Sequence, residues 1–227
     1  MSATLEILLS DLAAQSVLNF DVTVVDSLSS DNTLDILEKY SRKLDLNYIS
    51  EDDAGIYYGL NKAIRLCNGT HCLCLGADDR IIDSDFVAKL IDSNLNPDIL
   101  YYTDIWIKQK SLVRKKFYKD YYDFKCCYGG LAHFHHQTAL IPLAFLSKTE
   151  YDTRFQTYSD LDLMFRAQAN MHCKKLDICG VLFSSSGVSG SFKSVFRRLT
   201  EIMKIRRSNG LSTLNMRVIF SLLRQLL

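Results

Sequence analysis

The amino-acid sequence predicts an α/β protein in which a mostly parallel sheet is flanked by helices. Short apolar segments alternate with amphipathic ones over roughly the first hundred residues, which is typical of parallel strands joined by helices. The run Val22–Val25 holds only valine and threonine, and it indicates a buried strand that ends at Asp26. A length of 227 residues with 48% hydrophobic content suffices for the core of one domain.

The expected elements follow one another in the first half of the chain. Leucines at helical spacing indicate an amphipathic helix over 4–18, before the strand. After the strand, a polar turn offers Ser30 or Asp31 as the cap of a second helix, which ends near Tyr40. The same patterns then predict a strand over 46–49, a helix over 56–66, a strand over 72–75, a helix over 84–93 and a strand over 99–103.

The alternation stops after Asp104. From Trp106 to Tyr122 the chain mixes aromatic and basic residues without helical periodicity, which predicts antiparallel strands or a long flap. Basic residues between aromatics also occur in nucleic-acid-binding proteins. We expect no nucleic-acid partner, because the body of the chain is acidic and contains no known nucleic-acid-binding motif; a solvated hairpin face is the preferred interpretation.

The end of the chain is basic. From Phe192 onward lie eight of the 27 basic residues but only one of the 26 acidic residues. This asymmetry predicts a main domain over 1–190 and a tail over 191–227 that forms two basic amphipathic helices, 192–207 and 211–227. Such helices lie on anionic membrane surfaces, pack onto the body of the protein or mediate self-association, and the sequence leaves these alternatives open.

Cysteine usage and hydropathy bear on the location of the protein. The seven cysteines include no C-x-x-C pair, which is typical of thiols in a reducing compartment. The N-terminus does not resemble a signal peptide, and no run is long and apolar enough to span a bilayer. We therefore expect a cytoplasmic protein, with peripheral contact to the inner membrane face if the tail binds lipid.

Two adjacent carboxylates, Asp78 and Asp79, follow the strand expected over 72–75. Ligands of open α/β sheets bind beyond the carboxyl ends of the strands. Two aspartates there repel each other unless a cation or a shared proton lies between them. A divalent ion that holds a diphosphate would remove this repulsion. Alternatively, the pair only turns the chain and caps the helix that starts near Asp83.

Two further segments carry candidate functional side chains. His133, His135 and His136 lie close together, but they lack a fourth zinc ligand, so we expect one histidine to line a pocket instead. In the segment from Tyr158 to Arg166, Ser159 can cap a helix that has Asp160 in its first turn. Asp160 either stabilises the helix dipole or, across a cleft from the aspartate pair, acts as a general base.

Five motifs in this order resemble family 2 glycosyltransferases of the GT-A fold, in particular bacterial members that build capsule, O-antigen or exopolysaccharide. The resemblance covers roughly Leu5 to Gly190. The motifs are V-V-D-S-L-S-S-D-N-T from Val24, S-E-D-D-A-G-I-Y from Ser50 with Asn61-Lys62, the strand from Gly69 to Asp79, His136-Gln137, and the helix from Ser159 to Arg166.

The resemblance implies an inverting transfer of a sugar from a nucleoside-diphosphate sugar, a UDP-sugar in particular, to a saccharide or lipid-linked acceptor. Asp160 would be the catalytic base, and Asp79, helped by Asp78, would bind Mn²⁺ or Mg²⁺. The residues implied to bind the donor are Asp26, Ser29, Glu51, Asp53, Gly55, Asn61, Lys62, Asp78 and His136.

The chain also departs from the family pattern. Family members usually begin with one more strand, whose end contacts the donor base, whereas this chain begins inside the helix that should follow it. The usual Gly-Gly after the first aspartate is Ser27-Leu28, and the usual aspartate after Gly-Ile-Tyr is Tyr58. These departures keep a second hypothesis open: a truncated, catalytically inactive relative that acts as a binding or assembly partner.

Overall fold

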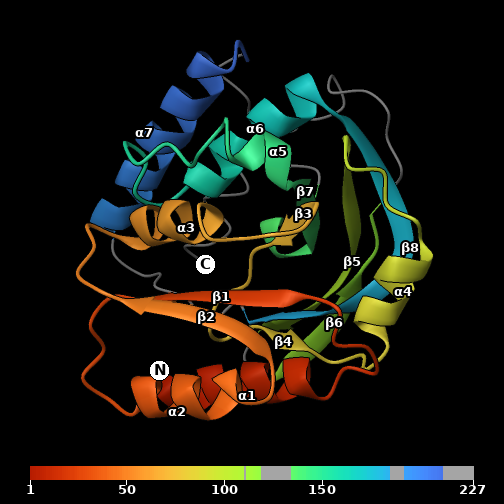
Figure 1. The fold of residues 1–227 in the computed structure, drawn as a ribbon. Helices are drawn as coiled ribbons and strands as arrows, with labels where there is room; N and C mark the ends of the chain where they lie inside the picture. The colour runs from red at the N-terminus through yellow and green to blue at the C-terminus, as the bar shows by residue number, and fades with distance from the viewer. Residues whose placement is uncertain (110, 119–133, 185–191, 212–227) are drawn as a thin grey trace.

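The computed structural model describes residues 1–109, 111–118, 134–184 and 192–211. Helices flank two β-sheets, as the α/β prediction requires (Figure 1). The elements are α1 (Ser2–Ala13), β1 (Asp21–Asp26), α2 (Thr33–Ser41), β2 (Asp45–Ser50), α3 (Ile56–Ile64), β3 (His71–Leu73), β4 (Arg80–Ile81), α4 (Phe86–Asp92), β5 (Ile99–Gln109), β6 (Leu112–Lys116), the 3₁₀ turn η2 (His136–Thr138), β7 (Ala139–Pro142), α5 (Leu143–Leu146), α6 (Ser159–Asn170), β8 (His172–Ser184) and α7 (Phe192–Ser208).

The strand directions are more mixed than the sequence predicts. β1 and β2 form a parallel two-stranded sheet, and the larger sheet has the order β3-β7-β5-β8-β4, with β6 paired to β5. In the larger sheet only β5 and β8 run parallel; the other four pairings are antiparallel. The connection from β5 to β6 is too short for a crossover helix, so these strands can pair only in the antiparallel sense. Trp106 to Lys116 thus form the predicted antiparallel hairpin.

The two sheets leave two strand edges without a strand partner. Within the described residues β1 pairs only with β2, and β3 pairs only with β7. Backbone groups on an unpaired edge remain available to water, side chains or another strand.

Long strands and amphipathic helices form the core. β5 lies inside the larger sheet, where Leu100, Tyr102 and Ile105 are completely buried. On the smaller sheet, α1 and α2 pack together through a second cluster that includes Leu9 and Leu37. Each helix therefore presents one apolar face inward, as the leucine spacing in the sequence predicts.

The first helix of the basic tail packs onto the body of the protein. In Figure 1, α7 lies beside α6. Ile202 and Ile205 of α7 are completely buried in a cluster with Phe155, Leu161 and Phe165. This apolar side of α7 is therefore not available to a membrane, and packing onto the body is the correct alternative for it. Residues 212–227, which hold most of the second expected tail helix, lie outside the described residues. Among the described helices, none has the length and hydrophobicity needed to cross a bilayer.

Candidate active site

The carboxyl end of β1 carries the first candidate residue, Asp26. One oxygen, Oδ2, accepts hydrogen bonds from the Ser50 hydroxyl at 2.7 Å and from the Ser29 backbone N–H at 3.0 Å. Burial acts to raise the pKa of Asp26, but the hydrogen bonds from Ser29 and Ser50 outweigh it and lower that pKa. Asp26 is therefore an ionised carboxylate at neutral pH, fixed at the end of a strand together with Ser29, its predicted neighbour in the donor site.

The loop after β2 joins this carboxylate. The Glu51 N–H donates to the Asp26 carbonyl oxygen at 3.0 Å, and the Lys62 Nζ lies 2.8 Å from Glu51 Oε1. Asp53 Oδ1 accepts the N–H of Gly55 at 2.8 Å, just before α3 begins. Gly55 has φ of 136°, a backbone conformation that side-chain-bearing residues rarely adopt. All these predicted donor-binding residues thus form one connected group at the carboxyl ends of the parallel strands.

The aspartate pair after β3 consists of one exposed and one buried carboxylate. Asp79 is only 1% exposed, whereas Asp78 is exposed. Asp79 Oδ2 accepts the Gly76 N–H at 2.8 Å, and its Oδ1 accepts the Ser184 N–H at 3.4 Å. Burial raises the pKa of Asp79 to about 6, the charge of Asp78 adds to this, and the two backbone hydrogen bonds act in the opposite direction. Ionised Asp79 is thus incompletely compensated by the protein itself.

The geometry of this pair fits a divalent cation. A Cβ added to Gly76 would lie 3.0 Å from Asp78 Oδ1 and 3.3 Å from Asp79 Oδ2, so both carboxylates border the space that glycine leaves empty. Mg²⁺ and Mn²⁺ prefer such carboxylate oxygens. In the part of the chain that the structure describes, no group of three His, Cys, Asp or Glu side chains could hold a metal ion. The two aspartates would therefore need further ligands from a bound substrate and water.

Asp160 lies in the first turn of α6, as predicted. Its Oδ1 is 3.1 Å from the Tyr57 hydroxyl and accepts the Leu161 N–H at 2.8 Å, whereas its Oδ2 has no hydrogen-bond partner among the described residues. Within the part of the chain that the structure describes, the carboxylate is thus held through Oδ1 alone, and Oδ2 can accept a proton. The expected cap is wrong: Ser159 is the first residue of α6, and its buried hydroxyl makes no hydrogen bond within the described part.

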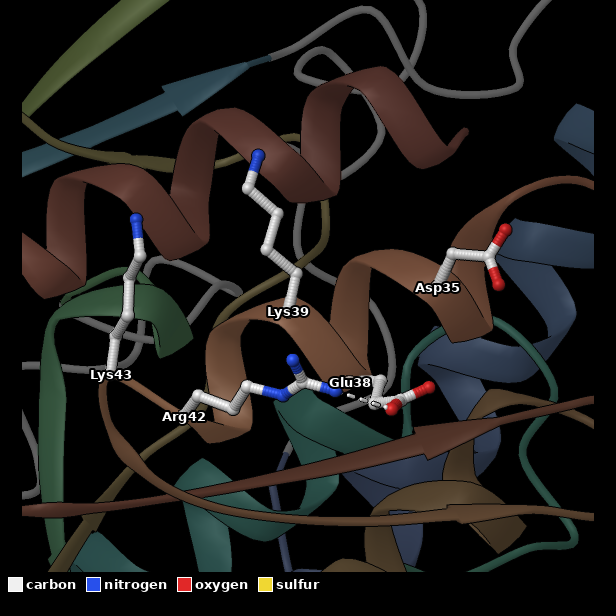
Figure 2. A pocket seen from close by; sticks show the side chains of 5 residues that line it. All are labelled: Asp35, Glu38, Lys39, Arg42 and Lys43. Carbon is white, nitrogen blue, oxygen red and sulfur yellow. Dashed lines mark hydrogen bonds and ion pairs between the residues drawn. The ribbon is translucent and has the colours of Figure 1, made fainter.

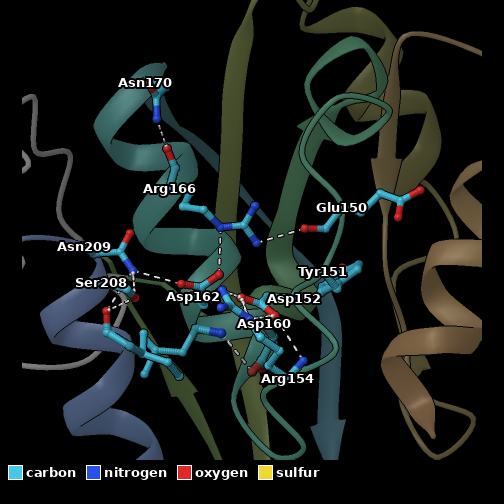
Figure 3. Close-up of polar contacts among 12 residues, drawn as sticks. Glu150, Tyr151, Asp152, Arg154, Asp160, Asp162, Arg166, Asn170, Ser208 and Asn209 are labelled. Carbon is cyan, nitrogen blue, oxygen red and sulfur yellow. Dashed lines mark hydrogen bonds and ion pairs between the residues drawn. The ribbon is translucent and has the colours of Figure 1, made fainter. Parts of the chain in front are cut away.

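The second aspartate of this turn, Asp162, has a different environment (Figure 3). It is buried, and its Oδ2 lies 2.7 Å from Arg166 Nε, while its Oδ1 accepts the Asn209 amide at 2.9 Å. Arg166 also donates to the Glu150 carbonyl oxygen at 2.9 Å. Asp162 therefore connects α6 with the end of α7 and with the loop that follows α5, and both of its oxygens are occupied.

Two tyrosines that the sequence did not single out as site residues complete the surroundings of Asp160. The Tyr57 hydroxyl is 2.8 Å from the Thr157 carbonyl oxygen as well as close to Asp160, and its ring stacks on Tyr151 with centroids 5.6 Å apart. The Tyr151 hydroxyl contacts His136 Nε2. Burial lowers the pKa of His136, so the ring is neutral at pH 7. His136 thus lies in the group around Asp160, linked to it through two stacked tyrosines.

Asn61, a predicted donor-binding residue, has its side chain engaged with the backbone of Tyr151. Its Nδ2 donates to the Tyr151 carbonyl oxygen at 2.9 Å, and its Oδ1 accepts the Tyr151 N–H at 2.8 Å. The residue is only 5% exposed. This pairing fixes Tyr151 against α3, and the geometry supports a structural role for Asn61; a donor-binding role stays a prediction.

Replacing Asn61 with alanine is expected to lower the free energy of unfolding by about 2–4 kcal/mol, because a buried N–H and a buried C=O of Tyr151 would lose their partners. Urea denaturation followed by circular dichroism measures this change. The matched control is Asn47→Ala on the exposed side of β2, which should change stability by less than about 0.5 kcal/mol. Equal stability of the two variants would contradict the structural role.

The structure brings the predicted residues together in three groups. The donor-loop group contains Asp26, Ser29, Glu51, Asp53, Gly55 and Lys62; the second group is the pair Asp78 and Asp79; the third contains Asp160, His136 and Asn61. Within the described residues, no hydrogen bond or ion pair joins Asp160 to the aspartate pair. A connection runs through Tyr151, whose hydroxyl is 3.3 Å from Cys74 Sγ, shortly before Gly76. His133 lies outside the described residues.

A hollow on α2 does not belong to these groups (Figure 2). It is lined by charged side chains of α2 and of the two residues that follow it: Asp35, Glu38, Lys39, Arg42 and Lys43. Glu38 pairs with Arg42 at 2.8 Å, and Lys39 pairs with Glu6 of α1 at 2.6 Å. These exposed pairs are typical of a solvated helix face.

A family profile defines the class of the protein. The sequence profile described as glycosyl transferase family 2 matches residues 2–141, which is more than half of the chain. The chain belongs to this family.

Particular relatives and solved structures agree with this assignment. The chain is 32% identical over 109 residues to the PGL/p-HBAD biosynthesis glycosyltransferases of Mycobacterium bovis and Mycobacterium tuberculosis, a match that covers 46% of this chain and 43% of each relative. The chain thus matches less than half the length of these curated relatives.

Two solved structures share the fold. The first is S. aureus TarS (1–349) in complex with UDP, with a TM-score of 0.66 at 20% identity over 88% of this chain and 61% of that one. The second is the mannosyltransferase PcManGT from Pyrobaculum calidifontis in complex with GDP-Man and Mn²⁺, with a TM-score of 0.65 at 16% identity over 92% of this chain and 60% of that one. Both support the GT-A fold class that the motifs imply.

Proposed function

We propose that this protein is an inverting glycosyltransferase that transfers a sugar from a nucleoside-diphosphate sugar to a hydroxyl group of a saccharide or lipid-linked acceptor in surface polysaccharide synthesis. The observation that carries the proposal is the state of Asp160: Tyr57 and the α6 backbone hold one carboxylate oxygen, and the other has no hydrogen-bond partner among the described residues. A carboxylate arranged in this way is suited to accept the proton of an attacking hydroxyl.

The donor is proposed to bind between the donor-loop group and the aspartate pair. A UDP-sugar is the preferred donor, supported by the binding of UDP to TarS, although the solved mannosyltransferase contains GDP-Man. Asp79 and Asp78 would hold Mn²⁺ or Mg²⁺, which, when bound, neutralises charge on the departing diphosphate. The negative potential of these carboxylates otherwise disfavours a diphosphate, which is a physical reason to expect metal dependence.

The proposed reaction needs little covalent participation by the protein. The acceptor hydroxyl attacks the anomeric carbon, its proton moves to Asp160 Oδ2, and the bond from that carbon to the diphosphate oxygen breaks on the opposite face. Attack from the face opposite the leaving group inverts the configuration at the anomeric carbon. Alignment of donor and acceptor, together with electrostatic stabilisation, would then supply most of the rate.

The first test is calorimetric titration of the purified chain with UDP, GDP and dTDP, each with and without Mn²⁺. The proposal expects one nucleotide to bind, and to bind only when the metal is present. Sugar transfer from the matching nucleotide sugar to acceptor analogues then tests the reaction itself. Folded protein that binds none of the three nucleotides would contradict the donor site.

The truncated, inactive relative is the second candidate function. Within the described residues, the edges of β1 and β3 that lie away from β2 and β7 have no strand partner, and such open edges, which could pair with another protein, support this candidate. In that case the chain would bind a partner protein and would turn over no nucleotide sugar. Nucleotide binding without any turnover, under conditions in which Asp160 is intact, would support this alternative. A cytoplasmic location stays a prediction from the sequence.

Tyr57→Phe is expected to lower kcat about 10-fold or more while leaving the KM for the donor unchanged, because it removes a hydroxyl that holds the Asp160 carboxylate. The neighbouring Tyr58 is 42% exposed and serves as the matched control, since Tyr58→Phe should keep full activity. Steady-state kinetics of both variants measures the difference. A Tyr57→Phe enzyme with unchanged kcat would show that this hydroxyl does not position the base.

A further inference from the structure

The β5–β6 hairpin presents an outer face with an unusual composition. Its register pairs Trp106 with Lys115 and Lys108 with Val113. Because side chains alternate between the faces of a strand, these four residues and Phe117 lie on the same face. The Lys115 Nζ lies 4.8 Å from the Phe117 ring centroid and 6.0 Å from that of Trp106, so this face interleaves cations with aromatic rings.

Apolar side chains of the hairpin are exposed to a degree that folding does not require. Phe117 is 69% exposed, Leu112 is 60% exposed and Val113 is 48% exposed. The buried apolar residues of the same hairpin, Ile105 and Ile107, lie on the face opposite Val113 and Phe117. Leu112 pairs with Gln109 at the end of the hairpin and lies on the Ile105 side. Neighbouring exposed apolar residues of this size often mark an interaction surface.

The hairpin is also the most basic segment outside the tail. The stretch from Ile105 to Tyr118 contains five basic and no acidic residues, in a chain whose net charge is only +1. Lys108 and Arg114 are exposed. The partner that this surface fits is therefore anionic and also accommodates apolar side chains.

We propose that the β5–β6 hairpin docks the protein onto an anionic lipid surface. Lysine and arginine would contact lipid phosphates, while Phe117 and Val113 on the outer face and Leu112 at the end of the hairpin would enter the boundary between the headgroups and the acyl chains. A soluble polyanion such as a nucleic acid or a phosphorylated glycan would use the cations but would leave the aliphatic side chains in water. The lipid surface uses both.

The position of the hairpin gives this docking a consequence for the active site. Lys108 pairs with Ser184 of β8, and the Ser184 N–H donates to Asp79 Oδ1. Through Ser184, the end of β5 is thus connected to the aspartate pair. Docking here would hold the proposed active site at the membrane surface, where a lipid-linked acceptor would present its sugar. The docking itself does not depend on the proposed transfer reaction.

Vesicle flotation of the full chain tests the proposal without requiring activity. The wild-type protein is expected to float with vesicles of phosphatidylcholine and phosphatidylglycerol, to stay behind with phosphatidylcholine alone, and to be released by high salt. The hairpin variant replaces four cations by glutamine: Lys108→Gln, Arg114→Gln, Lys115→Gln and Lys116→Gln. Its partition coefficient should fall about 100-fold or more, since each cation near an anionic surface contributes a several-fold factor.

Two variants serve as controls for charge and for the tail. The first removes the same number of cations elsewhere through Lys39→Gln, Arg42→Gln, Lys43→Gln and Lys89→Gln, and it should bind vesicles within about threefold of the wild type if location rather than net charge decides. The second, Lys204→Gln with Arg207→Gln, changes exposed cations of α7 and should also bind. Circular dichroism confirms that each variant is folded.

A fourth variant, Phe117→Ser, tests the apolar contribution and should weaken binding about 10-fold. The proposal is overturned if the wild type does not float with the anionic vesicles, or if the hairpin variant floats as well as the wild type. A loss confined to the α7 variant would assign membrane contact to the tail instead. Binding of the hairpin to soluble polyphosphate, with none to vesicles, would identify a soluble polyanion as the partner and would also overturn it.

Discussion

Asp160→Asn is expected to lower kcat by about 10²–10⁴-fold, the usual contribution of a general base, while UDP binding and the unfolding temperature stay close to those of the wild type. The amide can still accept hydrogen bonds from Leu161 and Tyr57 through its oxygen, so the first turn of α6 should keep its structure. It cannot take the proton of the acceptor hydroxyl at neutral pH. Steady-state transfer kinetics, combined with calorimetry of UDP and Mn²⁺, separates the chemical step from donor binding.

Asp162→Asn is the matched control, because Asp162 lies in the same turn and carries the same side chain. This substitution should lower the free energy of unfolding by about 1–3 kcal/mol, because the negative charge that faces Arg166 disappears and one contact to Arg166 or Asn209 weakens. At a temperature where the variant is fully folded, kcat should stay near the wild-type value. Comparable losses of kcat in both variants would contradict the assignment of the base to Asp160.

Asp79→Asn is expected to abolish the metal-dependent part of nucleotide binding and at the same time to stabilise the metal-free protein at pH 7. The pKa of Asp79 is raised to about 6 from the usual 3.8. The folded state therefore binds the proton more tightly than the unfolded state, and the free energy of unfolding decreases as the pH rises from about 4 to 6. The shift corresponds to a cost of about 3 kcal/mol at neutral pH, most of which an uncharged asparagine would remove.

Thermal unfolding at several pH values without divalent ions measures this difference. The Asp79→Asn protein should exceed the wild type in stability at pH 7 and lose the advantage at or below about pH 4, where Asp79 is protonated. Asp98→Asn, at an exposed position, is the control and should alter neither stability nor binding. If Mn²⁺ promotes UDP binding equally in wild type and Asp79→Asn, the metal is held by other groups.

The sequence predicted the α/β class and, apart from the two-residue strand β4, the order of the elements up to β5, because these depend on local patterns. The Val22–Val25 run lies within β1, and the expected helix over 56–66 overlaps α3. The mixed direction of the larger sheet was missed, since strand direction depends on which strands become neighbours. β7, which runs antiparallel to both β3 and β5, illustrates a pairing that local patterns do not reveal.

The positions of candidate site residues could be predicted where a local sequence motif contains them. Contacts between residues that are far apart in the sequence could not. Asp79 and Asp160 follow recognisable segments, and the structure places them as expected, after β3 and in α6. The pairing of Asn61 with Tyr151 joins residues 90 positions apart and could not be inferred from either neighbourhood. Nor could the sequence show that Asp162, two residues after Asp160, has both oxygens occupied.

The division of the strands into two sheets bears on how the protein opens. In the described residues, β1 and β2 share no ladder hydrogen bond with the larger sheet, and with α1 and α2 they have a core of their own around Leu9 and Leu37. Such a segment can unfold as a separate cooperative unit. Asp26 belongs to this unit and Asp79 to the other. A donor bound by both aspartates would therefore couple the two units, so that they open together. Amide hydrogens of β1 and β2 would then exchange fast in the free protein and at the rate of the larger sheet once the nucleotide is bound.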